Sequence, residues 1–132
     1  MYGIIISILL APVFSIAATP AIKKQYDDFQ KTYTQTLELS KDKVLFAKEF
    51  DKKNKSLKKK YDDLVKTEKS SLSNEGNQMA LDIEMLEPLE FLASSRINKE
   101  SCSEADFLNE LNEKSDPETF QRIKKSLQTL CK

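Results

Sequence analysis

The chain has 132 residues, with 21 basic and 21 acidic side chains, a formal net charge of zero and no histidine. This length allows one domain at most, and the lack of histidine removes the commonest catalytic base and metal ligand together. Only two glycines occur, so a glycine-rich phosphate-binding loop is excluded as well.

The N-terminal segment, residues 1–18, has the composition of a signal peptide. Residues 2–22 carry no charge, and residues 4–16 form an apolar block that is followed by small residues suited to cleavage. The block is short for a transmembrane helix, and Pro12 and Pro20 disfavour one. We therefore expect a cleaved leader and an exported protein, periplasmic or secreted; an uncleaved N-terminal anchor is the alternative.

Residues 19–76 are expected to form one long amphipathic, coiled-coil-like helix. Apolar side chains recur there in steps of three and four. A Tyr-Asp-Asp phrase begins at Tyr26 and again at Tyr61, and this offset of five heptads keeps both copies on one helical seam. Polar residues interrupt the seam at Ser40 and within 51–56, the most turn-like stretch, but the stripe resumes in phase and favours a continuous helix.

Residues 77–132 are expected to form a helical base in the same domain. A second amphipathic helix is predicted over residues 78–98, kinked or split at Pro88. Two shorter helices follow, the second beginning with Asp116 as its N-cap and a proline directly after it. No strand pattern competes anywhere, so the predicted fold class is all-α.

The two cysteines, Cys102 and Cys131, are expected to form one disulfide. An even number of cysteines behind an export signal is typical of disulfide pairing. The bond would join the two ends of the last helical hairpin and stabilise the fold by about 3–4 kcal/mol. Two buried reduced thiols are the alternative, and they would need a cytoplasmic chain.

The zero net charge hides two halves of opposite sign. Residues 21–73 hold 14 lysines and 9 acids, a net charge of +5, and residues 74–132 hold 7 basic and 12 acidic residues, a net charge of −5. Docking of one half on the other is the favoured interpretation, with Asp82 and Glu90 among the acids that would face the lysines. The alternative is a basic arm that contacts an external anion.

Four aromatic side chains of the long helix are candidate partner contacts. A helix of about 50 residues would span about 75 Å, whereas the predicted second helix spans only about 32 Å. Part of the aromatic stripe is therefore expected to meet another protein or a second copy of the chain, as in a homodimer through the N-terminal helix. Burial in the core or in a coiled-coil seam is the alternative. The candidate contacts are Tyr26, Phe29, Tyr33 and Tyr61.

A lysine cluster in the same helix is the candidate contact for an anionic surface. Such a cluster suits lipid headgroups or cell-wall polymers, while the lack of arginine in this half disfavours nucleic acid. A solvated or internally paired helix face is the alternative. The lysines are Lys52, Lys53, Lys55, Lys58, Lys59 and Lys60.

These patterns favour a small exported helical protein that acts by binding, as an adaptor, a chaperone-like protein or an inhibitor. No catalytic, cofactor-binding or metal-binding residues are predicted, and no enzyme activity is expected. The adjacent aspartates after Tyr26 and Tyr61 point about 100° apart on a helix, which suits ion pairing rather than acid–base catalysis. The alternative function is an envelope-surface or membrane-associated structural protein that uses the lysine cluster on anionic polymers or lipids.

Overall fold

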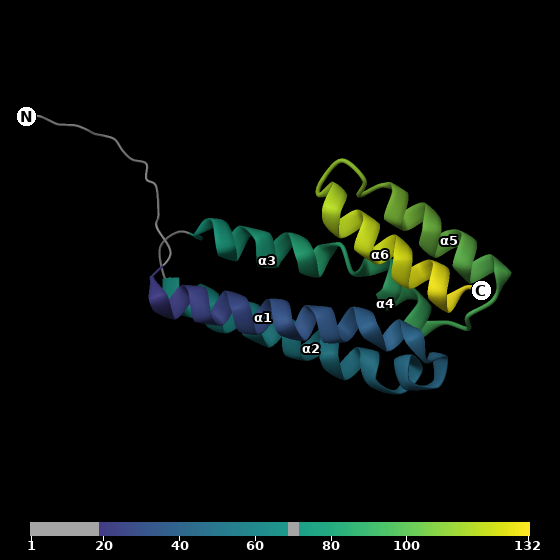
Figure 1. Ribbon diagram of the computed structural model, residues 1–132, viewed down its shortest axis with the longest axis horizontal. Helices are drawn as coiled ribbons and strands as arrows, with labels where there is room; N and C mark the ends of the chain where they lie inside the picture. The colour runs from purple at the N-terminus through teal and green to yellow at the C-terminus, as the bar shows by residue number, and fades with distance from the viewer. Residues whose placement is uncertain (1–18, 69–71) are drawn as a thin grey trace, which may run out of the picture.

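The computed structural model describes residues 19–68 and 72–132, and within these ranges the protein is built from helices without strands (Figure 1). The predicted all-α class is confirmed, and the expected signal peptide lies outside the described residues. The elements in order are α1 (Pro20–Glu38), the 3₁₀ helix η3 (Leu39–Lys41), α2 (Lys43–Glu68), α3 (Asn74–Glu84), α4 (Glu87–Ser94), α5 (Lys99–Glu110) and α6 (Pro117–Leu130).

The basic N-terminal half forms a hairpin of two antiparallel helices. α1 and α2 lie side by side and are joined by η3 (Figure 1). At the open end Gln25 Nε2 donates a hydrogen bond to Thr67 Oγ1 (3.3 Å), and nearer the turn Lys53 Nζ donates to Gln35 Oε1 (3.4 Å). The expectation of one continuous long helix is wrong, although α2 does run unbroken through residues 51–56.

The turn between α1 and α2 has a local cause. Asp42 has an extended backbone (φ −138°, ψ 109°), and its Oδ1 atom accepts hydrogen bonds from the N–H groups of Val44 (3.0 Å) and Leu45 (3.2 Å). The carboxylate thus satisfies N–H groups of the first turn of α2, which have no partner within the helix. The Ser40 hydroxyl donates to the Leu37 carbonyl oxygen (2.8 Å) at the end of α1. These local bonds end α1 and begin α2, although the spacing of apolar residues continues in phase across the turn.

The two copies of the repeated phrase lie opposite each other near the open end of the hairpin. Lys60 Nζ, just before the second copy, contacts Asp28 Oδ2 of the first at 2.6 Å. In a single helix, the offset of five heptads would place both copies on the same seam. In the antiparallel hairpin, the same offset places them opposite each other. Their tyrosines, Tyr26 and Tyr61, are partly buried and pack against the core.

One hydrophobic core joins this hairpin to the other helices. Its largest buried side chains include Phe29 and Tyr33 of α1, with ring centroids 5.9 Å apart, and Phe46 and Phe50 of α2, at 5.1 Å. Phe29 and Tyr33 are 0% exposed, so they are core residues and cannot be contacts of a partner in this fold. Most of the aromatic stripe is therefore used in packing.

The helix expected over residues 78–98 is two helices, as its proline predicted. α3 ends at Glu84, a short turn follows, and Pro88 is the second residue of α4, where the missing N–H costs nothing. α3 begins earlier than expected, because the Ser73 side chain caps it. α4 ends at Ser94, and a short irregular segment leads to α5.

Gly76 lies where the first turn of α3 meets the end of α2. A Cβ atom at this position would lie 2.7 Å from Glu68 Oε1, 3.0 Å from Leu64 Cδ2 and 3.2 Å from Leu72 Cδ2. We expect Gly76→Ala to lower the free energy of unfolding by about 1 kcal/mol, because crowding against buried Leu64 outweighs the better helix propensity of alanine. Urea denaturation measures this. A variant more stable than the wild type would show that the neighbouring side chains move aside freely.

α5 and α6 form the expected hairpin, and a disulfide joins its two ends. Cys102 and Cys131 are bonded, with their Cα atoms 6.0 Å apart. Asp116 caps α6 by accepting a hydrogen bond from the Thr119 N–H group (3.2 Å), and Pro117 is the first residue of the helix. The predicted disulfide and the predicted start of α6 are both confirmed.

Candidate functional site

The six lysines predicted to face an anionic surface lie on α2, and four of them are paired with acids of the same protein. The pairs are Lys55–Asp51 (2.9 Å), Lys58–Glu90 (3.4 Å), Lys59–Asp63 (3.0 Å) and Lys60–Asp28 (2.6 Å). These pairs are largely exposed, so each contributes at most about 1 kcal/mol to stability. The pairing favours the interpretation of a solvated, internally paired helix face.

The described residues show one direct ion pair between the two halves of the chain. Among the described residues, the Lys58–Glu90 pair is the only ion pair that crosses from the basic half to the acidic half. Asn54 adds to it, because its Nδ2 donates to the same Glu90 Oε2 at 2.8 Å. Asp82, expected beside the lysines, is 2% exposed and faces α1 and α6 instead. Asp82 therefore belongs to a different site.

That site is a crevice between α1 and α6, which holds two hollows that share Arg122 as a lining residue. The hollow near the end of α1 has a volume of about 240 Å³, and the one near the start of α6 has a volume of about 270 Å³. We call them the basic hollow and the acidic hollow of the α1–α6 crevice. Charged side chains border the basic hollow at Glu38, Lys41, Arg122 and Lys125, and the acidic hollow at Asp82, Asp116, Glu118 and Arg122.

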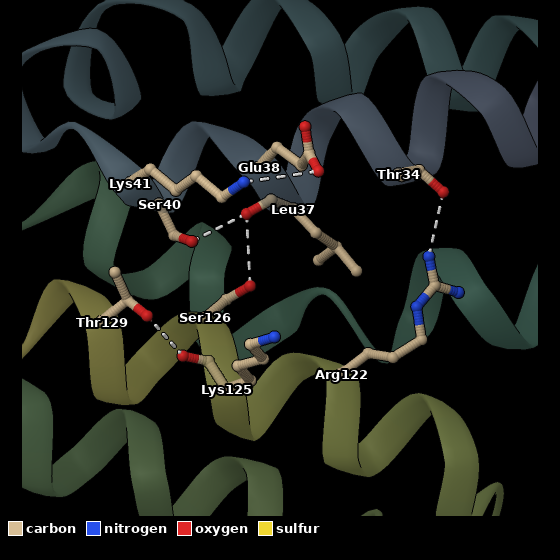
Figure 2. Close-up of a pocket in the computed structure, with 9 residues that line it drawn as sticks. All are labelled: Thr34, Leu37, Glu38, Ser40, Lys41, Arg122, Lys125, Ser126 and Thr129. Carbon is tan, nitrogen blue, oxygen red and sulfur yellow. Dashed lines mark hydrogen bonds and ion pairs between the residues drawn. The ribbon is translucent and has the colours of Figure 1, made fainter.

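Hydroxyl groups hold α6 against the end of α1 in the basic hollow (Figure 2). Ser40 Oγ and Ser126 Oγ both donate to the carbonyl oxygen of Leu37, at 2.8 and 3.2 Å. Leu37 is among the last four residues of α1, where carbonyl groups have no partner further along the helix. Ser40 makes a local bond to this carbonyl oxygen from η3, whereas the bond from Ser126 links α6 to the end of α1.

Arg122 is fixed between the two helices. Its Nη2 donates to Thr34 Oγ1 at 3.1 Å, and its guanidinium carbon lies 5.3 Å from the centroid of the Tyr33 ring. A planar guanidinium is suited to this position over an aromatic face. Lys125 lies three residues later on α6, extends toward α1 in Figure 2 and makes no ion pair with any described residue.

Asp82 of α3 is the buried group of the acidic hollow. Gln30 Nε2 donates to its Oδ2, and Gln78 Nε2 donates to its Oδ1, both at 2.8 Å. The Gln78 amide also donates to Asp116 Oδ2 at 2.9 Å. The Tyr33 hydroxyl donates to the backbone carbonyl oxygen of Asp82 at 2.9 Å. One aspartate thus connects α1 with α3 and, through Gln78, with the start of α6.

The two carboxyl groups of this cluster have opposite pKa shifts. Burial raises the pKa of Asp82, although hydrogen bonds from Gln30 and Gln78 oppose the shift. Burial acts in the same direction on Asp116, but hydrogen bonds from the Thr119 backbone and from Gln78 outweigh it, so the pKa of Asp116 is lowered. Burial also raises the pKa of Tyr33, which keeps its hydroxyl protonated as a donor.

Replacing Asp82 with asparagine should change how stability depends on pH. Because its folded-state pKa is raised, the stability contributed by Asp82 is complete below the ordinary aspartate pKa and is lost as the pH rises through the folded-state pKa. Relative to the wild type, Asp82→Asn should therefore become more stable as the pH rises above the ordinary aspartate pKa, because only the wild type then has to ionise a buried carboxyl group. Urea unfolding at several pH values measures the difference.

Asp116→Asn is the matched control for this experiment. Asparagine caps a helix about as well as aspartate, so the substitution mainly removes a charge. The lowered pKa of Asp116 contributes stability above the ordinary pKa that is lost as the pH falls through the folded-state pKa. This variant should therefore lose stability relative to the wild type at neutral pH. If both variants changed stability in the same direction, the opposite pKa shifts of Asp82 and Asp116 would be contradicted.

The acidic hollow contains one buried carboxylate whose hydrogen bonds are already made within the protein. Both carboxylate oxygens of Asp82 accept hydrogen bonds from amides, and the residue is only 2% exposed although it borders the acidic hollow. Within the described parts of the chain, no group of three or more cysteine, aspartate or glutamate side chains is arranged to hold a metal ion. What the crevice offers a ligand is charge, positive at one end and negative at the other.

Only some of the residues predicted from the sequence as partner contacts belong to this site. Among the predicted partner contacts, Tyr26 lines the acidic hollow and Tyr33 lies beneath Arg122. Phe29 and Tyr61 line neither hollow. One signal was present in the sequence, because Arg122 is one of two arginines in a chain that otherwise uses lysine. Arginine is the cation suited to a fixed, stacked position.

In the two described ranges, no helix combines the length and the apolar character needed to cross a membrane. The chain matches no model of a protein family, no curated protein and no solved structure. No relative therefore assigns a role to the α1–α6 crevice.

Proposed function

We propose that this is a small exported helical protein that acts by binding, as an adaptor, a chaperone-like protein or an inhibitor, and that the α1–α6 crevice is its binding site. One observation carries the proposal: Lys125 is an exposed cation without an ion-pair partner among the described residues, beside a guanidinium that is already fixed. Export is supported by the disulfide, which persists in oxidising compartments, and by the composition of residues 1–18.

The crevice supports binding better than the aromatic stripe does. Phe29 and Tyr33 are buried in the core, whereas the crevice is open and its walls are held by hydrogen bonds between helices. A binding site works best when its contact groups are fixed before the partner arrives. Opposite charges at the two ends of the crevice would also favour one orientation of a partner with complementary charges.

Site-specific photo-cross-linking tests this proposal. A photoreactive amino acid at Thr129, on the rim of the basic hollow, should give a defined cross-linked product in the native envelope or extracellular fraction. The same amino acid at Val65, an exposed position on α2 outside the crevice, is the matched control and should not give this product. Adding Lys125→Gln to the Thr129 variant should reduce the yield.

Three results would contradict a binding role of the crevice. They are no product from Thr129, the same product from Val65 and Thr129, and a yield unaffected by Lys125→Gln. The second result would instead indicate a partner that covers another part of the surface.

The lysine cluster on α2 still supports the alternative function, an envelope-surface protein bound to anionic polymers or lipids. Exposed ion pairs are weak, so an external polyanion can compete for these lysines. Sedimentation with vesicles rich in anionic lipid measures such binding. If the lysine cluster binds the vesicles, the triple variant with Lys58, Lys59 and Lys60 changed to glutamine should bind several-fold more weakly. Added salt should weaken binding in the same way. Insensitivity to both changes would rule out this electrostatic function.

A further inference from the structure

The basic hollow carries more positive charge than its own acid can balance. Three of its lining residues, Lys41, Arg122 and Lys125, are cationic, and Glu38 is the single acid among the residues that line it. Glu38 pairs with Lys41 at 3.6 Å, on an exposed rim. Neither Arg122 nor Lys125 forms an ion pair with a described residue, so both can contact a ligand, although Arg122 also borders the acids of the acidic hollow.

One of these two cations is held in place, and the other lies beside it on the same helix. The guanidinium of Arg122 has five N–H groups, and one bond to Thr34 and the Tyr33 ring hold it in place. Lys125, three residues further along α6, lies on the same face of the helix. An arginine fork next to a lysine ammonium is an arrangement that recognises carboxylate and phosphate oxygens.

The floor of the hollow also tolerates an anion. A free carbonyl oxygen would repel a negatively charged ligand, but the Leu37 carbonyl accepts hydrogen bonds from both Ser40 and Ser126. Thr34 Oγ1 accepts from Arg122, which leaves its own O–H free to donate to a ligand. A volume of about 240 Å³ is below that of typical drug-sized sites, roughly 300–1,000 Å³. The hollow therefore fits one functional group and not a whole cofactor.

We propose that the basic hollow binds a single oxyanion group, a carboxylate or a phosphate, between Arg122 and Lys125. This inference rests on the proposed function, because it names the chemistry that the crevice recognises on its partner. A second lysine-lined hollow, beside the disulfide at Lys99 and Lys132, is the comparison site. No arginine lines it, so it holds no fixed guanidinium fork.

Titration with small anions, followed by NMR of backbone amides and the Arg122 side chain, tests the inference without any partner. Inorganic phosphate and acetate are the two probes, and sodium chloride at matched ionic strength is the reference. Saturable shifts are expected at Thr34, Arg122 and Ser126. Lys125→Gln should weaken binding roughly fivefold, whereas Lys99→Gln at the comparison site should leave it unchanged.

The two probes also separate the sources of the oxyanion. A response to phosphate alone assigns the site to phosphorylated ligands, and a response to both extends it to carboxylates. The inference is overturned if chloride produces the same shifts, if neither probe saturates, or if Lys99→Gln weakens binding as much as Lys125→Gln does.

Failure of this inference differs from failure of the proposed function. Anion binding without a cross-linked product from Thr129 would leave the oxyanion site standing and remove the partner-binding role. A cross-linked product that depends on Lys125, without small-anion binding, would do the reverse.

Discussion

Tyr33→Ala is expected to lower the free energy of unfolding by about 4 kcal/mol, which is typical for truncation of a fully buried aromatic residue. Tyr33 is 0% exposed and stacks on Phe29. Its hydroxyl satisfies the carbonyl group of Asp82 near the end of α3, and its ring supports Arg122 of α6. The substitution therefore removes a contact shared by three helices. Chemical denaturation, with the slope checked for two-state behaviour, measures the loss.

Tyr33→Phe separates the hydroxyl from the packing. This variant keeps the ring and leaves the Asp82 carbonyl oxygen without its donor, so we expect a cost of about 1–2 kcal/mol. Equal losses in the two variants would show that the hydrogen bond, and not the buried ring, dominates. Losses below about 1 kcal/mol in both would contradict the central place of Tyr33.

Removing the disulfide is expected to lower the free energy of unfolding by about 3–4 kcal/mol, the chain-entropy value for a loop of this size. Cys102 and Cys131 are 29 residues apart, and the enclosed loop contains nearly all of α5 and α6. Without the bond, the unfolded chain regains the freedom that the loop had restricted. The double variant Cys102→Ser/Cys131→Ser, unfolded in urea, measures the change.

The wild-type protein treated with a reductant is the matched comparison, because it has the same sequence without the bond. It should unfold at the same urea concentration as the double variant. A reduced protein as stable as the oxidised one would mean that contacts between α5, α6 and α4 hold this hairpin alone. It would also mean that the bond serves a purpose other than stability.

The sequence predicted the all-α class, the split at Pro88, the start of α6 and the disulfide, because each depends on local signals. The prediction of one continuous helix over residues 19–76 was wrong, because a local helix-start signal and a long-range apolar pattern disagreed there. Asp42 is a good N-cap residue, but the prediction followed the in-phase apolar stripe and did not use this signal. Two antiparallel helices with buried facing stripes have the same periodicity as one long helix. Periodicity alone cannot distinguish them.

The crevice could not be predicted for a different reason. Thr34 and Arg122 are 88 residues apart, and so the site exists only once α6 lies on α1. The same holds for Asp82. The acids that follow it, Glu84, Glu87 and Glu90, are exposed, whereas Asp82 is buried because α3 packs against other helices. Such sites depend on tertiary contacts and leave no spacing pattern in the chain.

The position of Arg122 at the border of both hollows makes proton binding and oxyanion binding thermodynamically linked. Burial raises the pKa of Asp82, and the positive charge of Arg122 opposes a small part of that rise. A bound oxyanion would offset part of that charge, so Asp82 would keep its proton to a higher pH. Linkage of two binding equilibria is reciprocal, and protonation of Asp82 would therefore tighten oxyanion binding. With such coupling the affinity for the oxyanion would be higher at acidic pH than at neutral pH.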